Sequence, residues 1–118
     1  MSAIFSDLIG KTILKIEGDV HSDVLRFYAE NGNYRMCHYR DCCENVSIED
    51  IDGDLGDLLN TPVLDAYEST NSNLPGHNDD ESFTWTFYVI RTMKATVTIR
   101  WYGSSNGYYS ESVDFEKE

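Results

Sequence analysis

The chain has 118 residues and a formal net charge of −12, from 21 acidic and 9 basic residues. This balance excludes general binding to DNA or RNA backbones and to anionic membrane surfaces, because both need many Lys and Arg side chains. Hydrophobic residues make up 41% of the chain, which is too many for a disordered acidic tail, yet no apolar stretch is long enough to cross a bilayer. We therefore expect one soluble globular domain over residues 1–118.

The first third of the chain predicts a short helical turn followed by three antiparallel strands. Residues 5–10 form the predicted turn, because serine can cap it and glycine can end it. Residues 11–17 and 23–30 are predicted strands with many β-branched and aromatic side chains. An Asn-Gly pair follows and favours a tight hairpin turn into a third strand at residues 34–39.

The middle of the chain has a less regular pattern. Residues 46–48 and 63–68 are predicted short strands, and residues 54–59 are a predicted short helix. Residues 69–82 consist almost entirely of turn-forming and acidic residues, so we expect a mobile, exposed acidic loop there.

The last third has the clearest pattern, because apolar and polar side chains alternate along it. Residues 83–90, 95–102 and 108–115 predict a continuous antiparallel meander with one buried face. The predicted buried residues are Phe83, Trp85, Phe87, Val89, Val97, Ile99, Trp101, Val113 and Phe115. The whole pattern predicts an α+β fold that is mainly β, a bent antiparallel sheet of meander hairpins with one or two short helices.

Acidic residues are concentrated in the middle of the chain. No Lys or Arg lies between Arg40 and Arg91, a span that holds twelve acidic residues. A surface with one sign of charge attracts cationic partners, so we interpret this span as an acidic face for a basic protein surface. The alternative is a solvated edge that keeps the protein soluble. The residues expected on the partner-binding face are Glu49, Asp50, Asp52, Asp54, Asp57, Asp79, Asp80 and Glu81.

A second candidate site surrounds an arginine on the polar side of a predicted strand. Its guanidinium could grip a phosphate or carboxylate while nearby aromatic rings stack on a base or sugar. The alternative, which we favour, is a cross-strand ion pair between Arg100 and Glu111. The candidate ligand-binding residues are Arg100, Tyr102, Asn106, Tyr108, Tyr109 and Glu111.

A third candidate site is a compact cluster of His, Cys and carboxylate side chains, the residue types that bind zinc. Structural zinc sites normally take two paired half-sites, and this sequence offers one cluster, so we expect no cofactor and keep zinc as an alternative. Two further alternatives are a buried structural cysteine and a reactive thiol beside the histidine. The candidate metal ligands are His38, Asp41, Cys42, Cys43 and Glu44.

Several short motifs resemble those of a known family. They are residues 41–44 (DCCE), 48–50 (IED), 53–54 (GD), 99–101 (IRW) and 105–115 (SNGYYSESVDF). The chain is similar through them to a family of small proteins of unknown function from bacteriophages, prophages and some bacteria. The resemblance implies a phage-type accessory protein that acts inside a bacterial cell.

These features lead to three hypotheses about function. The first is a phage-type acidic binding protein that inhibits a host factor with a basic surface, such as an anti-defence protein whose acidic face imitates nucleic acid. The second is a binding or sequestering protein for a nucleotide-like small ligand, and the third is a metal-binding protein. We find no catalytic signature and expect no direct nucleic acid binding and no membrane binding. The N-terminal residues lack the basic and apolar regions of a signal peptide, so we expect the cytoplasm of a bacterial host.

Overall fold

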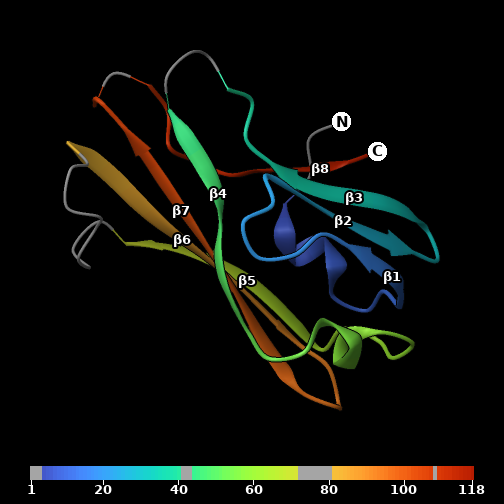
Figure 1. Cartoon of the computed structure of the whole chain (residues 1–118). Helices are drawn as coiled ribbons and strands as arrows, with labels where there is room; N and C mark the ends of the chain where they lie inside the picture. The colour runs from blue at the N-terminus through green and yellow to red at the C-terminus, as the bar shows by residue number, and fades with distance from the viewer. Residues whose placement is uncertain (1–3, 41–43, 72–80, 108) are drawn as a thin grey trace.

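A computed structural model describes residues 4–40, 44–71, 81–107 and 109–118. The chain forms two four-stranded antiparallel sheets, with the strand orders β1-β2-β3-β8 in the first sheet and β4-β7-β6-β5 in the second (Figure 1). The elements are η1 (Phe5–Leu8), β1 (Ile13–Glu17), β2 (Val24–Ala29), β3 (Gly32–Cys37), β4 (Asn45–Asp52), η2 (Leu55–Leu58), β5 (Asp65–Asn71), β6 (Ser82–Arg91), β7 (Thr96–Ser105) and β8 (Asp114–Lys117). The prediction of a mainly β, antiparallel fold with one or two short helices is confirmed, and both helices are single 3₁₀ turns.

The first three strands form the predicted meander. β2 pairs with β3 from Val24↔Cys37 to Ala29↔Gly32, so the connection is a tight two-residue turn. Gly32 has a φ of 138°, which a residue with a side chain adopts only with strain. The Asn-Gly signal therefore predicts the hairpin correctly but places the turn one residue too late, because the turn residues are Glu30 and Asn31 and Gly32 begins β3.

The C-terminal meander was predicted with an error in its third strand. β6 and β7 pair as expected, from Ser82↔Ser105 to Arg91↔Thr96. The chain then leaves the second sheet, and β8 pairs with β3 of the first sheet instead of with β7. Glu111 packs over Gly103 where the chain crosses, and a Cβ at Gly103 would lie 2.5 Å from the Glu111 carbonyl oxygen. The absence of a side chain at this position is what lets the crossing segment lie against β7.

The buried face of β6 was also predicted wrongly. Thr86, Tyr88 and Ile90 are buried, whereas Phe83, Trp85, Phe87 and Val89 are half-buried. Because cross-strand partners share a face, Phe87 lies on the same side as its partner Arg100, away from the buried Ile99. The aromatic alternation of β6 thus marks its outer surface.

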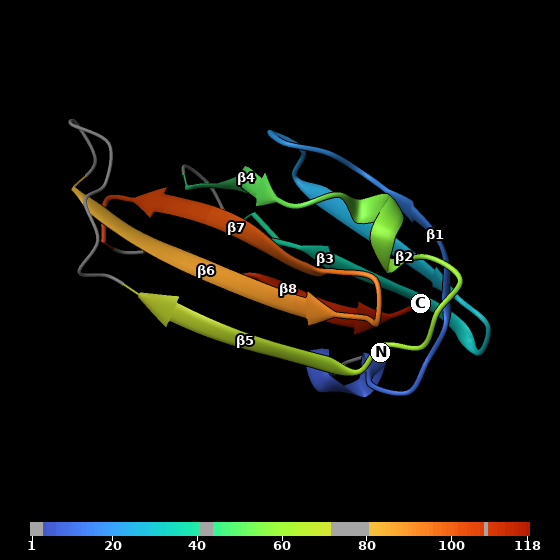
Figure 2. The same cartoon turned by 90° about the horizontal axis from the view of Figure 1, so that it is seen from below.

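The core lies between the two sheets. Its largest fully buried side chains include Phe27 and Met36 from the first sheet and Trp101 and Tyr88 from the second. Phe5 of η1 joins the two layers, because its ring centre lies 4.7 Å from that of Tyr88 and 5.3 Å from that of Phe115. Figure 2 shows β4, β7, β6 and β5 side by side in one layer, with the first sheet stacked against it.

The predicted acidic loop at residues 69–82 lies largely outside the described residues. Its first residues belong to β5, which continues to Asn71, and its last residue begins β6. β4 also extends further than predicted, because a bulge between Ile48 and Asp50 lets the strand continue along β7. Among the described residues, no helix is long and apolar enough to span a bilayer.

Candidate functional site

The outer face of the second sheet carries an unusual set of apolar side chains. Along β6 they are Phe83, Trp85, Phe87 and Val89, all half-buried. Tyr67 of β5 pairs with Val89 and is 51% exposed. Apolar side chains on the solvent side of an antiparallel sheet are unexpected for a protein that makes no contacts there, because that side normally carries polar residues.

The rings on this face pack into one cluster. Trp85 contacts Tyr102 of β7 edge-to-face, with ring centres 4.8 Å apart. Phe83 stacks on Tyr102 with ring centres 5.9 Å apart, and the ring centre of Phe87 lies 6.4 Å from that of Trp85 with nearly parallel ring planes. Tyr102 itself is buried beneath its neighbours. We call Tyr67, Phe83, Trp85, Phe87, Val89 and Tyr102 the aromatic face.

An ion pair borders the aromatic face on the β4 side. The guanidinium of Arg100 donates a hydrogen bond to the carboxylate of Asp50, its cross-strand partner. The favoured alternative from the sequence, a pair between Arg100 and Glu111, is therefore wrong. Glu111 instead accepts hydrogen bonds from the hydroxyls of Thr84, at 2.8 Å, and Ser105. The Nε atom of Arg100 is buried and has no hydrogen-bond partner among the described residues.

The acidic residues of the predicted partner-binding face fall into two groups. Glu49, Asp50, Asp52, Asp54 and Asp57 follow one another along β4 and into η2, at one edge of the second sheet. We call these five residues the acidic edge. The Asp54 carboxylate also caps η2, because it accepts a hydrogen bond of 2.8 Å from the Gly56 N–H.

The second acidic group lies at the other end of the sheet. Glu81 is exposed and directly precedes the start of β6, whereas the acidic edge ends beside the start of β7. Asp79 and Asp80 lie outside the described residues. The structure thus brings together five of the eight predicted residues and separates Glu81 from them.

Sequence reasoning missed one acidic neighbour of this edge. Asp19 lines the same shallow hollow as Asp54 and Ile51. The loop that carries Asp19 is held against β4, because the His21 N–H donates to the Ile48 carbonyl at 2.7 Å and the Ile48 N–H donates to the Ser22 carbonyl at 2.9 Å. No local signal in the sequence indicates this contact between segments far apart in the chain.

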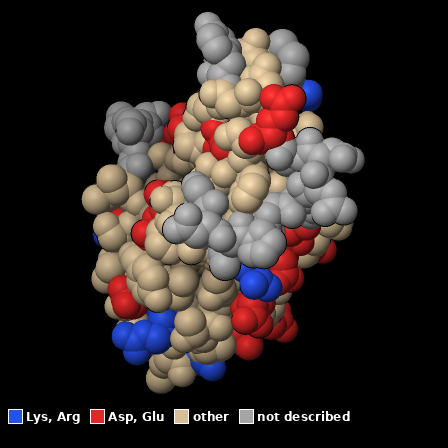
Figure 3. Space-filling view, turned by 90° about the vertical axis from the view of Figure 1, so that its left-hand side faces the viewer, with Lys and Arg blue, Asp and Glu red and all other residues tan. Residues whose placement is uncertain are grey.

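Figure 3 views the side on which β6 and β7 lie in Figure 1. Uncharged residues occupy much of the lower middle of this view. Acidic residues are gathered along one side of that area.

The candidate ligand-binding residues do not converge on one pocket. Arg100 and Tyr102 lie on the outer face of β7, paired there with Asp50 and packed against Trp85. Glu111 packs against Gly103 on the opposite, inner side, where it bonds Thr84. Asn106 and Tyr109 belong to the connection after β7, and Tyr108 lies outside the described residues.

His38 and Glu44 are brought together as the metal hypothesis expects, but as a buried hydrogen-bonded pair. The Nε2 atom of His38 lies 2.8 Å from the Glu44 carboxylate, and its Nδ1 atom lies 2.7 Å from the Ser112 carbonyl oxygen. A metal ion could bind His38 only if one of these hydrogen bonds were released. Asp41, Cys42 and Cys43 lie outside the described residues, and within the described part no three metal-binding side chains gather.

The remaining cysteine has the properties of a core residue. Cys37 is buried, and burial raises the pKa of its thiol. A thiol with a raised pKa is a weak nucleophile at neutral pH, because the thiolate is the reactive form.

The fold and the two surfaces define an antiparallel β-sandwich with an aromatic outer face and an acidic edge. The chain belongs to the family described as a domain of unknown function (DUF7448), whose model matches residues 6–115. No curated protein and no solved structure matches the chain.

Proposed function

We propose that this protein is a binding protein whose partner docks on the aromatic face of the second sheet. The observation that carries the proposal is the position of Trp85 and Phe87, which stand half-buried on the outer side of the sheet and not in the core. Aromatic side chains are enriched at the centres of protein interfaces, where they provide most of the binding energy. Burial of such a cluster by a partner would remove its apolar surface from water.

The partner in this proposal has a basic rim. The acidic edge runs beside the aromatic face, and Asp50 belongs to both the edge and the ion pair that borders the face. Complementary charges at the border of an interface raise the rate of association and select partners.

The finer part of the proposal concerns the biological setting. The motifs at residues 41–44 and 105–115 support a phage or prophage origin. In that setting the partner is a host protein with a nucleic-acid-binding surface, and the acidic edge occupies the basic residues of that surface. This makes the protein an inhibitor of a host factor that belongs to a defence system.

The proposal is tested by comparing three tagged forms of the protein as baits in a bacterial lysate. Phe87→Ser with Tyr67→Ser removes apolar groups from the aromatic face, and Asp52→Asn with Asp57→Asn removes two charges from the acidic edge. A matched control, Glu30→Gln with Glu118→Gln, removes two charges elsewhere. A true partner is captured by the wild type and by the control. It is not captured by the aromatic-face variant or by the acidic-edge variant.

The salt dependence of the purified complex provides the second measurement. The affinity should fall about tenfold or more when the salt concentration rises from about 50 mM to about 300 mM, because exposed charges are screened over this range. A partner that binds equally well at both salt concentrations, or that binds both face variants as tightly as the wild type, would exclude this docking surface.

A further inference from the structure

A groove opens between the two sheets on the side where each sheet ends. β5 is the last strand of the second sheet and β8 is the last strand of the first sheet. Ala66, Tyr67 and Glu68 of β5 line one wall, and residues 113–116 line the other. The groove has a volume of about 460 Å³, which is within the range of ligand-binding clefts.

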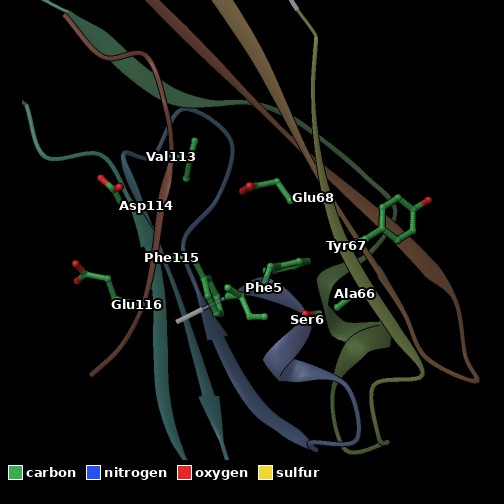
Figure 4. Close-up of a pocket in the computed structure, with 10 residues that line it drawn as sticks. Phe5, Ser6, Ala66, Tyr67, Glu68, Val113, Asp114, Phe115 and Glu116 are labelled. Atoms are coloured by element: carbon green, nitrogen blue, oxygen red, sulfur yellow. The ribbon is translucent and has the colours of Figure 1, made fainter. Parts of the chain in front are cut away.

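The floor of the groove is apolar and well anchored. Figure 4 shows Phe5 between the two walls, with Phe115 on one side of it and Ala66 on the other. Phe5 and Phe115 are buried and contact each other edge-to-face at 5.3 Å. A floor fixed by core contacts is preformed and does not have to reorganise when an occupant binds.

One carboxylate points into the space above this floor. Glu68 extends from β5 toward β8, whereas the neighbouring Tyr67 points to the other side of its strand (Figure 4). The Glu68 carboxylate interacts with the hydroxyl of Tyr88, which also lies 3.4 Å from the Val113 carbonyl oxygen. Asp114 and Glu116 belong to the β8 wall, but their side chains point to the other side of β8, where Glu116 pairs with Arg35.

The backbone of both walls offers further hydrogen bonds. Within the part of the chain that the structure describes, β8 pairs only with β3 and β5 pairs only with β6. Strands at the end of a sheet present a row of N–H and C=O groups that an extended chain can use. Addition of a strand to such an edge is a recurring mode of peptide recognition.

We infer that this groove binds an extended peptide that pairs with the edge of β8 opposite β3, which no described strand occupies, and places a Lys or Arg side chain against Glu68. Apolar side chains of the same peptide pack on Phe5 and Phe115. The occupant is basic because the charged side chain directed into the groove is the carboxylate of Glu68. A second copy of this chain, with a net charge of −12, does not fit that requirement. The inference does not rest on the proposed function, because the groove lies between the sheets and not on the aromatic face.

Short synthetic peptides test the inference. The probe is a pentapeptide of alternating threonine and valine with lysine at its centre, blocked at both ends, and two companions carry glutamine or glutamate at the centre. We expect the lysine peptide to bind with a Kd below about 1 mM and the glutamate peptide to bind at least about tenfold more weakly. Chemical shift changes of backbone amides should concentrate in β5 and β8.

Matched protein and peptide variants then distinguish the contribution of the Glu68 carboxylate to peptide binding from the contribution of backbone hydrogen bonds. Glu68→Gln should abolish the preference for lysine over glutamine, whereas Asp57→Asn, the same loss of charge on η2, should leave it unchanged. Two further lysine peptides test the strand pairing, one N-methylated at its odd-numbered residues and the other at its even-numbered residues. Only the N–H groups on one edge of the peptide pair with β8, so one of the two N-methylated peptides should lose binding.

Three results would overturn the inference. The first is the absence of binding by the lysine peptide at about 10 mM. The second is equal binding of both N-methylated peptides and the unmodified one, because strand pairing would then contribute nothing. The third is a dimer of this chain, detected by light scattering, that dissociates when β8 residues are altered, because a second copy would then be the occupant.

Discussion

His38 and Glu44 share one proton inside the protein. The Ser112 carbonyl oxygen can only accept a hydrogen bond, so the Nδ1 atom of His38, 2.7 Å away, must carry a hydrogen. The side chains of His38 and Glu44 are 6% and 0% exposed, and the atoms that face each other are 2.8 Å apart. A proton therefore lies between the ring and the carboxylate whether the pair is charged or neutral. The pair ties the start of β4 to the end of β3 and to the segment before β8.

This arrangement predicts different outcomes for two substitutions of Glu44. Glu44→Leu leaves the Nε2 atom of His38 buried without its partner and should lower the free energy of unfolding by about 1–3 kcal/mol. Glu44→Gln should cost clearly less, because its amide can donate to Nε2 of the ring. Urea unfolding followed by tryptophan fluorescence gives both values. Equal losses for the two variants would show that the hydrogen bond is not what stabilises this region.

The crossing of the chain over Gly103 predicts that no side chain larger than that of glycine fits at this position. A Cβ at this position would lie 2.5 Å from the Glu111 carbonyl oxygen and 3.0 Å from the Glu111 Cβ atom. Gly103→Ala should therefore lower the free energy of unfolding by about 1–3 kcal/mol, the usual cost of overpacking. Gly56→Ala is a suitable control, because the new methyl group would meet only the side chain of Asp54, and it should change stability by less than about 1 kcal/mol. Thermal melts of both variants test this prediction. A Gly103→Ala variant as stable as the wild type would contradict the crossing geometry.

The burial of Trp101 predicts that truncation of its side chain to alanine lowers the free energy of unfolding by a large amount. Replacement by phenylalanine should lower it by less. It is fully buried in the core of the second sheet, so Trp101→Ala should cost about 3–5 kcal/mol. Its indole N–H has no hydrogen-bond partner among the described residues. Trp101→Phe removes that unsatisfied donor as well as part of the ring, so the two effects oppose each other. Chemical unfolding followed by circular dichroism should place Trp101→Phe well above Trp101→Ala in stability.

The hydrogen bonds of the Glu116 carboxylate are expected to stabilise the fold to an extent that depends on pH. Hydrogen bonds from the Tyr39 hydroxyl and from the Arg35 guanidinium lower the pKa of the Glu116 carboxyl below its ordinary value of 4.5. A lowered pKa in the folded state means that the contribution is present above pH 4.5 and is lost as the pH falls through the folded-state pKa. Glu116→Gln should thus be less stable than the wild type at neutral pH, and the difference should shrink in acid. Urea melts from about pH 7 down to about pH 3 test this, and a difference that stays constant would contradict it.

The strands of this protein could be predicted from the sequence more readily than their faces. The error on β6 is instructive, because Phe83, Trp85 and Phe87 are more hydrophobic than the residues between them. The turn between β6 and β7 has four residues, so odd-numbered residues of one strand face even-numbered residues of the other. Phe87 therefore cannot share a face with Ile99, and turn length combined with the alternation of β7 predicts the correct face. Hydrophobicity alone gives the wrong one.

Other features have no local signal in the sequence. The alternation at residues 108–115 favours a strand, yet β8 begins at Asp114 because the chain first has to cross from one sheet to the other. The acidic residues of β4 and η2 could be predicted as a group from their spacing, because they belong to two consecutive elements. Their approach to Asp19 depends on the packing of the β1–β2 loop against β4, which a single sequence does not encode in any short pattern.

The pairing of β3 with β8 has a consequence for folding during synthesis on the ribosome. Arg35 and Glu116 form the ion pair that joins these strands, and 81 positions separate them in the chain. The hairpins β1–β2 and β2–β3 can form as soon as they emerge, because their contacts are local, whereas the fourth strand of the first sheet is translated only after the entire second sheet. Until then the edge of β3 has no strand to pair with, and the nascent chain exposes it to other polypeptides. Ribosome-bound chains that end before β8 should therefore be the species most prone to aggregate and most in need of a chaperone.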